Sequence, residues 1–189
     1  MNKSWIANGF TAANALFGGL SIMMSISGEY HVAAICILIA MAADAFDGRV
    51  ARALGTAGPM GVELDSLSDD ISFGVAAGAL MYSYQLRELG ALGFIPCALL
   101  GAFCAFRLAR FNVKVTSVHG YFEGLPCPTV GVIIACYVLS GVKIWNWLAM
   151  VCVLVLAVLM VSEVHYPDFK GKGEKIFLVS KVFAILLFG

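Results

Sequence analysis

Long apolar runs separated by short polar breaks make up most of the chain. A helix that spans a lipid bilayer needs about 20 mostly apolar residues. Windows of about this length follow one another closely, and they predict spanning helices at residues 10–27, 31–54, 61–85, 89–110, 126–142 and 144–161. A shorter apolar run at 176–188 favours a partial span or a helix in the membrane interface. The pattern therefore predicts an all-α integral membrane protein with six transmembrane helices and an extra C-terminal helix at about 174–189.

The composition agrees with this interpretation. The 189 residues are 61% hydrophobic and 13% charged, whereas soluble domains are about half apolar and about a quarter charged. The formal net charge is zero, which gives no electrostatic case for binding nucleic acid. No separate soluble domain is indicated, so we expect one membrane-embedded domain over residues 1–189 with its core at about 8–163. The six cysteines lie scattered in apolar stretches, without the spacing of a disulfide framework or a zinc site.

The lysines and arginines are distributed unevenly between the two ends of the predicted helices. With the N-terminus in the cytoplasm, most of them lie on the cytoplasmic side, and only Arg87 and Lys143 clearly lie on the other. Basic residues of short connections are retained in the cytoplasm. The sequence thus predicts a multi-pass protein of the cell membrane in this orientation.

Acidic residues are concentrated at the cytoplasmic ends of the second and third predicted helices. Six of the twelve lie within 27 consecutive positions, namely Asp44, Asp47, Glu63, Asp65, Asp69 and Asp70. Because a helix turns about 100° per residue, Asp44 and Asp47 share one face of the second helix. Asp65 and Asp69 similarly lie in line on the third helix. The short break between the helices forces antiparallel packing, so we expect these two pairs of carboxylates to face each other.

Four facing carboxylates at membrane depth need cations, because like charges about 4 Å apart repel strongly and each charge is costly in the bilayer. Oxygen ligands suit Mg²⁺, Mn²⁺ or Ca²⁺ rather than zinc. Four aspartates favour two ions about 3.5–4 Å apart, an arrangement typical of phosphoryl transfer. Gly48, Ala51 and Gly61 leave space for a bulky ligand, and Arg52 supplies positive charge for a phosphate. We assign the remaining acids, Glu63 and Asp70, to solvent, lipid headgroups or partner contacts.

The spacing of these residues resembles the signature of the CDP-alcohol phosphatidyltransferase family. The pattern Asp-x2-Asp-Gly-x2-Ala-Arg-x8-Gly-x3-Asp-x3-Asp is matched at Asp44, Asp47, Gly48, Ala51, Arg52, Gly61, Asp65 and Asp69. The resemblance implies a six-helix core, usually in a homodimer, with a polar cavity open to the cytoplasm. It also implies that the four aspartates bind two Mg²⁺ or Mn²⁺ ions, which hold the pyrophosphate of a CDP-linked lipid. An acceptor hydroxyl then attacks the lipid-side phosphorus and CMP leaves, with Asp69 as the candidate general base.

Three further stretches, RLARFNV at 107–113, EGLPCPTVG at 123–131 and VSEVHYPDFK at 161–170, resemble the membrane-embedded phosphatidylserine synthases of bacteria and archaea. This resemblance implies CDP-diacylglycerol and L-serine as substrates. Candidates for binding the serine carboxylate are Arg107, Arg110 and Asn112. The two arginines lie one helical turn apart and could form a two-pronged anion site, although both could equally be anchors that contact lipid phosphates.

The first predicted helix carries a polar stripe that includes Thr11 and Asn14. Hydrogen bonding between helices is one interpretation of this stripe, whereas the family resemblance favours contact with the CDP moiety. Ser66, beside Asp65, is a further candidate for contact with the ribose or cytosine.

Other functions stay open on the sequence alone. A sister transferase could use glycerol 3-phosphate or inositol phosphate, although these acceptors would need a stronger basic cluster. The lipid donor could carry ether-linked chains. A divalent-cation or proton-coupled transporter would also place acids in the membrane. Its polar path would have to continue across the bilayer, but the far halves of the second and third predicted helices are mainly apolar, which favours an enzyme.

Overall fold

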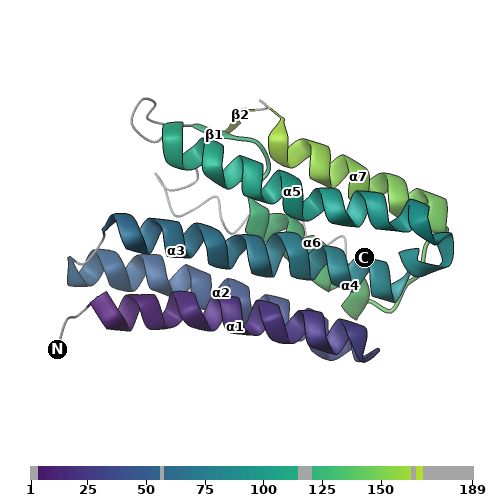
Figure 1. Cartoon of the computed structure of the whole chain (residues 1–189), viewed down its shortest axis with the longest axis horizontal. Helices are drawn as coiled ribbons and strands as arrows, with labels where there is room; N and C mark the ends of the chain where they lie inside the picture. The colour runs from purple at the N-terminus through teal and green to yellow at the C-terminus, as the bar shows by residue number, and fades with distance from the viewer. Residues whose placement is uncertain (1–3, 56–57, 115–120, 163–164, 168–189) are drawn as a thin grey trace.

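The computed structural model describes residues 4–55, 58–114, 121–162 and 165–167. Its α-helices are α1 (Ser4–Ile26), α2 (Tyr30–Leu54), α3 (Pro59–Asp69), α4 (Ala76–Tyr84), α5 (Ala91–Lys114), α6 (Cys127–Leu139) and α7 (Asn146–Val161). Figure 1 shows them as a bundle whose helices run mainly along the long axis of the molecule. α1 packs against α2, and α7 packs against α5 on the other side of the bundle.

α3 and α4 belong to one continuous helical rod. They are joined by η1 (Asp70–Val75), a π-helical segment whose wider turns begin directly after Asp69. Pro59 stands at the start of α3, where its missing N–H leaves no hydrogen bond unmade. α2 ends at Gly55, whose φ of 63° is the left-handed conformation that closes helices. α2 and α3 are therefore consecutive helices with only a few residues between them.

Two short strands form a small ribbon: one lies between α5 and α6 in the chain, and the other follows α7. The strand β1 (Tyr121–Glu123) is antiparallel to β2 (His165–Pro167). The hydrophobic pattern did not predict this ribbon, because three-residue strands leave no measurable periodicity.

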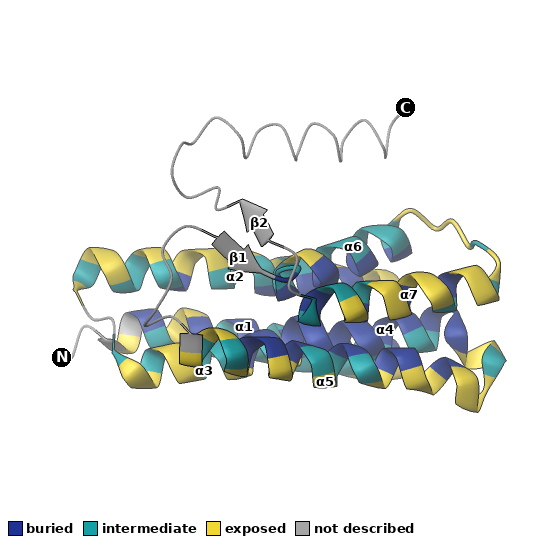
Figure 2. Ribbon diagram, turned by 90° about the horizontal axis from the view of Figure 1, so that it is seen from above, coloured by how far each residue is buried: buried dark blue, intermediate teal, exposed yellow. Residues whose placement is uncertain are grey.

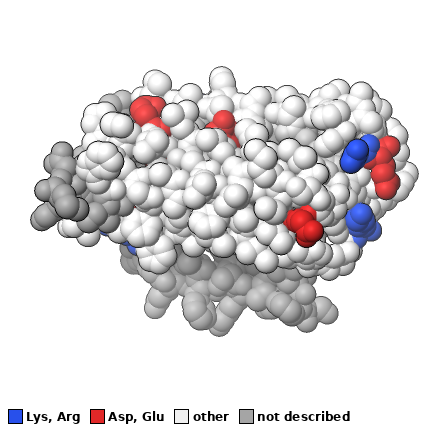
Figure 3. Space-filling view, turned by 60° about the horizontal axis from the view of Figure 1, so that its bottom comes forward, with Lys and Arg blue, Asp and Glu red and all other residues white. Residues whose placement is uncertain are grey.

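The surface and the helix lengths are those of a membrane protein. Three helical segments are long and apolar enough to cross a bilayer: Ala7–Ile26, Tyr30–Leu54 and Ala91–Val113. α6 and α7 are apolar but shorter. Exposed positions lie on the outer faces of the helices in Figure 2, and the face drawn in Figure 3 carries few charged side chains. Large exposed residues such as Leu16 and Phe94 suit contact with lipid.

The predicted all-helical membrane fold is thus confirmed in its main features. The count of six crossings goes beyond the three long helices and stays a prediction. The predicted C-terminal helix at 174–189 lies outside the described residues.

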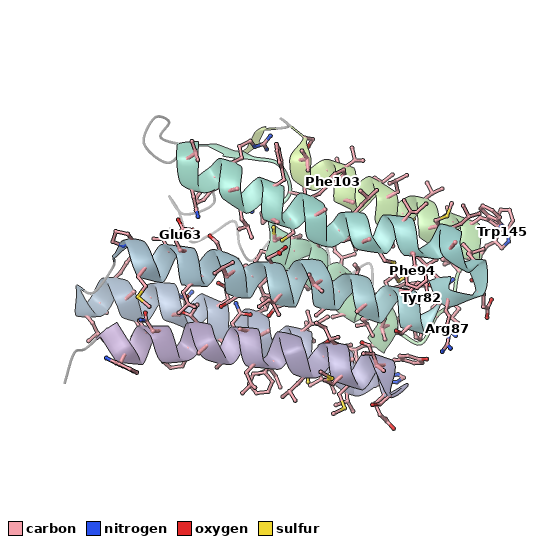
Figure 4. The ribbon with its side chains drawn as sticks, viewed as in Figure 1. Glu63, Tyr82, Arg87, Phe94, Phe103 and Trp145 are labelled. Carbon is pink, nitrogen blue, oxygen red and sulfur yellow. The ribbon has the colours of Figure 1, made fainter. Side chains whose placement is uncertain are left out.

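The two ends of the bundle differ in their side chains. Figure 4 shows Arg87 and Trp145 at one end, and Glu63 toward the opposite end. Tryptophan and arginine favour the boundary between hydrocarbon and water. Near the Arg87 end, Tyr82 of α4 stacks on Phe94 of α5 with ring centroids 4.1 Å apart. The end that carries Glu63 is also the end at which α2 and α3 meet.

Glycines allow the central helices to approach closely. A Cβ atom at Gly131 of α6 would lie 2.7 Å from Cδ1 of Phe73 and 3.3 Å from its Cα. Phe73 itself is fully buried in the centre of the bundle. Since part of this contact is backbone, a side chain at residue 131 requires the helices to move apart.

We therefore expect Gly131→Ala to lower the free energy of unfolding by about 1–3 kcal/mol, the usual cost of overpacking a core. The measurement is thermal unfolding of the purified protein in detergent. Gly19→Ala is the matched control, since a Cβ at Gly19 has no neighbour within 4 Å. Equal unfolding temperatures for the two variants would contradict the packing described for α6.

Candidate active site

Carboxylates from two helices converge near the connection between α2 and α3. Oxygen atoms of Asp44, Asp47 and Asp65 all lie within 4.8 Å of one another. Asp44 and Asp47 project from the last turns of α2, and Asp65 projects from α3. Asp69, one turn further along α3, is an electrostatic neighbour of both Asp44 and Asp65. α2 and α3 both pack on α1, and their antiparallel courses bring all four acids to one place.

The oxygens of this cluster are not all satisfied by the protein. Asp47 is 4% exposed and Asp69 is 8% exposed. Oδ2 of Asp47 and Oδ1 of Asp65 are buried and have no hydrogen-bond partner among the described residues. Burying an ionised oxygen without a partner is strongly unfavourable. A set of oxygen ligands with no sulfur or nitrogen suits a hard divalent cation, so these residues fit a metal ion of that class.

A pocket of about 200 Å³ lies beside the carboxylates. It is lined by Ala7, Asn8 and Thr11 of α1, by Asp47, Gly48, Ala51 and Arg52 of α2, and by Gly58, Gly61, Val62 and Asp65 around the start of α3. Most of these side chains are small, so a ligand can approach the helix backbones. A Cβ added to Gly48 would lie 3.4 Å from Nη1 of Arg52, which shows that the guanidinium lies over this glycine. The pocket therefore combines a cation, carboxylates and free space.

The two predicted polar residues of α1 have different surroundings. Thr11 lines the pocket, and its hydroxyl donates to the carbonyl of Ala7 at 3.2 Å. Asn14 is fully buried, and its Nδ2 donates to Oδ1 of Asp69 at 3.0 Å. The main-chain carbonyl of Asn14 accepts a hydrogen bond from the hydroxyl of Ser72 at 2.9 Å. Asn14 thus contacts the acidic cluster directly and does not line the pocket.

The two arginines of α5 point to different partners. Arg107 is 7% exposed, its Nη1 donates to Sγ of Cys127 at 3.6 Å, and its Nε has no hydrogen-bond partner among the described residues. Arg110 donates to the carbonyls of Val161 and Ser162 at 3.0 and 3.3 Å, at the C-terminal end of α7. The guanidinium of Arg107 therefore contacts α6, whereas that of Arg110 contacts the end of α7.

Asn112 and Ser66 lie together. Nδ2 of Asn112 donates to the hydroxyl of Ser66 at 3.0 Å, and this bond joins α5 to the turn of α3 that carries Asp65. Both residues were predicted as substrate contacts on separate grounds, and the structure places them beside each other at the edge of the acidic cluster.

Two residues near the site differ from the expectations drawn from the sequence. Asp70 does not point away from the bundle: its Oδ1 is buried without a hydrogen-bond partner, and it lies 2.7 Å from where a Cβ of Gly74 would be. α5 packs against η1, which contains Asp70. The periodicity of a single helix does not show which of its faces another helix covers. Ser72, which bonds to the carbonyl of Asn14, was not predicted from the sequence as a residue of the site. Its only sequence signal is a polar residue three positions after Asp69. Glu63 is exposed, as expected.

Comparison with known proteins identifies the family of the chain. The model of the CDP-alcohol phosphatidyltransferase family matches residues 4–187. The chain is 35% identical to a CDP-diacylglycerol–serine O-phosphatidyltransferase of Helicobacter pylori, over 96% of this chain and 80% of the relative. A Bacillus subtilis protein of the same name is 35% identical over 85% of this chain and 88% of its own length. An archaetidylserine synthase of Methanothermobacter thermautotrophicus is 37% identical over 85% of this chain and 68% of that protein.

The chain belongs to the CDP-alcohol phosphatidyltransferase family. It is therefore a transferase of phospholipid biosynthesis, and the acidic cluster beside the pocket is its candidate active site.

The cluster makes a direct prediction about metal binding. We expect Asp65→Asn to weaken Mn²⁺ binding by at least about tenfold, because it removes one charged ligand from the group of three. Electron paramagnetic resonance of Mn²⁺ added to the purified protein measures this change. The matched control is Glu63→Gln, which removes one negative charge from an exposed position on the same helix. Equal weakening by both variants would mean that general charge, rather than ligation, attracts the ion.

Proposed function

We propose that the enzyme is a phosphatidylserine synthase, which transfers the phosphatidyl group of CDP-diacylglycerol to the hydroxyl of L-serine and releases CMP. The observation that carries the transfer chemistry is the convergence of Asp44, Asp47 and Asp65 beside a pocket that contains Arg52. The choice of serine is supported by the names of relatives that are similar over most of the chain.

The pocket is assigned to the CDP-lipid. Asp44, Asp47, Asp65 and Asp69 would hold two Mg²⁺ or Mn²⁺ ions, which when bound neutralise the pyrophosphate and stabilise the departing phosphate. Arg52 contributes a further positive charge at the same pocket. The small residues Gly48, Ala51 and Gly61 let the phosphates approach the helix backbones. Thr11 and Ser66 are assigned to the cytidine end of the donor.

Asp69 is assigned to proton transfer. The serine hydroxyl oxygen forms a bond to the lipid-side phosphorus while its proton passes to the Asp69 carboxylate. The bond from that phosphorus to the bridging oxygen breaks, and CMP leaves with the electron pair. The buried position of Asp69 between α1 and the acidic cluster supports this role, since proton transfer requires a fixed acceptor within hydrogen-bond reach.

Arg107 is the better placed of the two arginines for the carboxylate of serine. Its guanidinium is buried and its Nε is unpartnered among the described residues. Asn112 of the same helix donates to Ser66, the chain neighbour of Asp65. Arg110 is engaged with the carbonyls of Val161 and Ser162. A phosphorylated acceptor such as glycerol 3-phosphate or inositol phosphate carries more negative charge, and it would call for a second free cation beside Arg107.

The proposal includes the setting of the enzyme. We place it in the cell membrane as a homodimer with the active site toward the cytoplasm. The uneven distribution of basic residues supports this orientation, because the site lies at the end that carries Arg49 and Arg52.

The deciding experiment measures CMP release by the purified enzyme in detergent with CDP-diacylglycerol as donor. We expect release with L-serine, little with glycerol 3-phosphate or inositol phosphate, and none after chelation of divalent cations. Restoring Mg²⁺ or Mn²⁺ should restore the reaction. Preference for a phosphorylated acceptor would contradict the serine assignment, and serine-dependent release that survives chelation would contradict the metal assignment.

We further expect Asp69→Asn to lower the rate of CMP release by at least about 100-fold, the usual contribution of a general base. Size-exclusion elution and thermal unfolding should show that the variant stays folded. Glu63→Gln, which neutralises an exposed acid of α3, should keep its rate. Near-normal turnover of Asp69→Asn would remove Asp69 from the chemical step.

A further inference from the structure

Asn14 makes two hydrogen bonds to the rod formed by α3, η1 and α4, while its side-chain Oδ1 is buried with no partner among the described residues. Its side-chain Nδ2 donates to Oδ1 of Asp69 at 3.0 Å, and its main-chain carbonyl accepts from the Ser72 hydroxyl at 2.9 Å. Asn14 and Ser72 are fully buried, and Asp69 is 8% exposed. Buried hydrogen bonds between two packed helices leave little freedom to the groups that make them.

A glycine next to this contact allows α1 to approach the rod closely. Gly18 lies one turn after Asn14, and a Cβ there would lie 2.8 Å from the Cα of Ser72. Any larger residue would push α1 away from η1 and stretch both hydrogen bonds. The π-helical turn begins directly after Asp69, and such turns are frequent at functional sites.

The contact distinguishes the two oxygens of Asp69. Oδ1 is occupied by the Asn14 amide. The carboxylate is at the same time an electrostatic neighbour of Asp44 and Asp65. Oδ2 accepts no bond from Asn14, so the two oxygens are not equivalent toward the cluster and toward a reacting group.

We propose that Asn14 is a positioning residue that holds the Asp69 carboxylate in one orientation, so that a single oxygen faces the reacting hydroxyl. The inference rests on the proposed function for the role of Asp69. It differs from the expectation that Asn14 contacts the CDP moiety, because Asn14 is not among the residues that line the pocket, whereas Thr11, one turn earlier, is.

Asn14→Leu tests the proposal, because leucine is of similar size and cannot donate a hydrogen bond. We expect kcat for CMP release to fall about 100-fold, as a misplaced catalytic group does. The KM values for CDP-diacylglycerol and serine should stay within about twofold, since an interaction that acts on the transition state changes kcat. Asn14→Asp should lower kcat at least as far, because it sets a second carboxylate against Asp69.

Two further variants separate positioning from general destabilisation. Ser21→Ala changes another buried polar residue of α1, two turns beyond Asn14, and it should keep both kcat and KM. Ser72→Ala removes only the bond to the Asn14 carbonyl and should lower kcat by about tenfold without changing KM. Tenfold higher KM for CDP-diacylglycerol with normal kcat in Asn14→Leu would overturn the proposal, because it would assign Asn14 to donor binding.

A double-mutant cycle tests the contact without any activity measurement. Asn14→Leu should lower the thermal unfolding temperature in detergent in the wild-type background, and this shift should largely vanish in an Asp69→Ala background. An equal shift in both backgrounds would show that Asn14 does not hold Asp69. If the wild type releases no CMP with serine, the proposed function fails, while the cycle still decides whether Asn14 fixes this carboxylate.

Discussion

The structure depends on the close approach of like charges in a setting of low polarity. Asp44 and Asp47 on α2 meet Asp65 on α3 within 4.8 Å, and two of their oxygens are buried with no hydrogen-bond partner among the described residues. Such an arrangement is unfavourable for the protein alone and becomes favourable when a divalent cation shares the oxygens. The three side chains come from two helices that both pack on α1, and their oxygens could hold a metal ion.

Different helices of the bundle place different residues around this cluster. α2 and the start of α3 provide the acids, the small residues and Arg52 on the side that faces the pocket. α1 lines the pocket with Thr11, and its Asn14 donates a hydrogen bond to Asp69. α5 packs against η1 and carries the buried guanidinium of Arg107, which contacts Cys127.

The far end of the bundle is held by a different kind of interaction. The hydroxyl of Tyr137 donates to Oε1 of Gln85 at 2.5 Å, Nε2 of Gln85 donates to Oδ1 of Asn146 at 3.0 Å, and Nδ2 of Asn146 donates to Oε2 of Glu88 at 2.6 Å. These neutral and singly charged groups join the segment directly after α4 to α6 and α7. Polar groups at that end thus stabilise the bundle, whereas those at the other end are partly unsatisfied and available for ligands.

The sequence alone determined the helical membrane fold and the identity of the acidic residues, because apolar run length and helical spacing are local properties that each segment carries by itself. It also indicated that Asp44, Asp47 and Asp65 belong together. Only the tertiary structure decided that Asn14 is hydrogen-bonded to Asp69, that Arg110 is engaged with the end of α7 and that Asp70 lies near α5. These outcomes depend on which helix covers a given face and on the π-helical turn of η1, and neither follows from the periodicity of one segment.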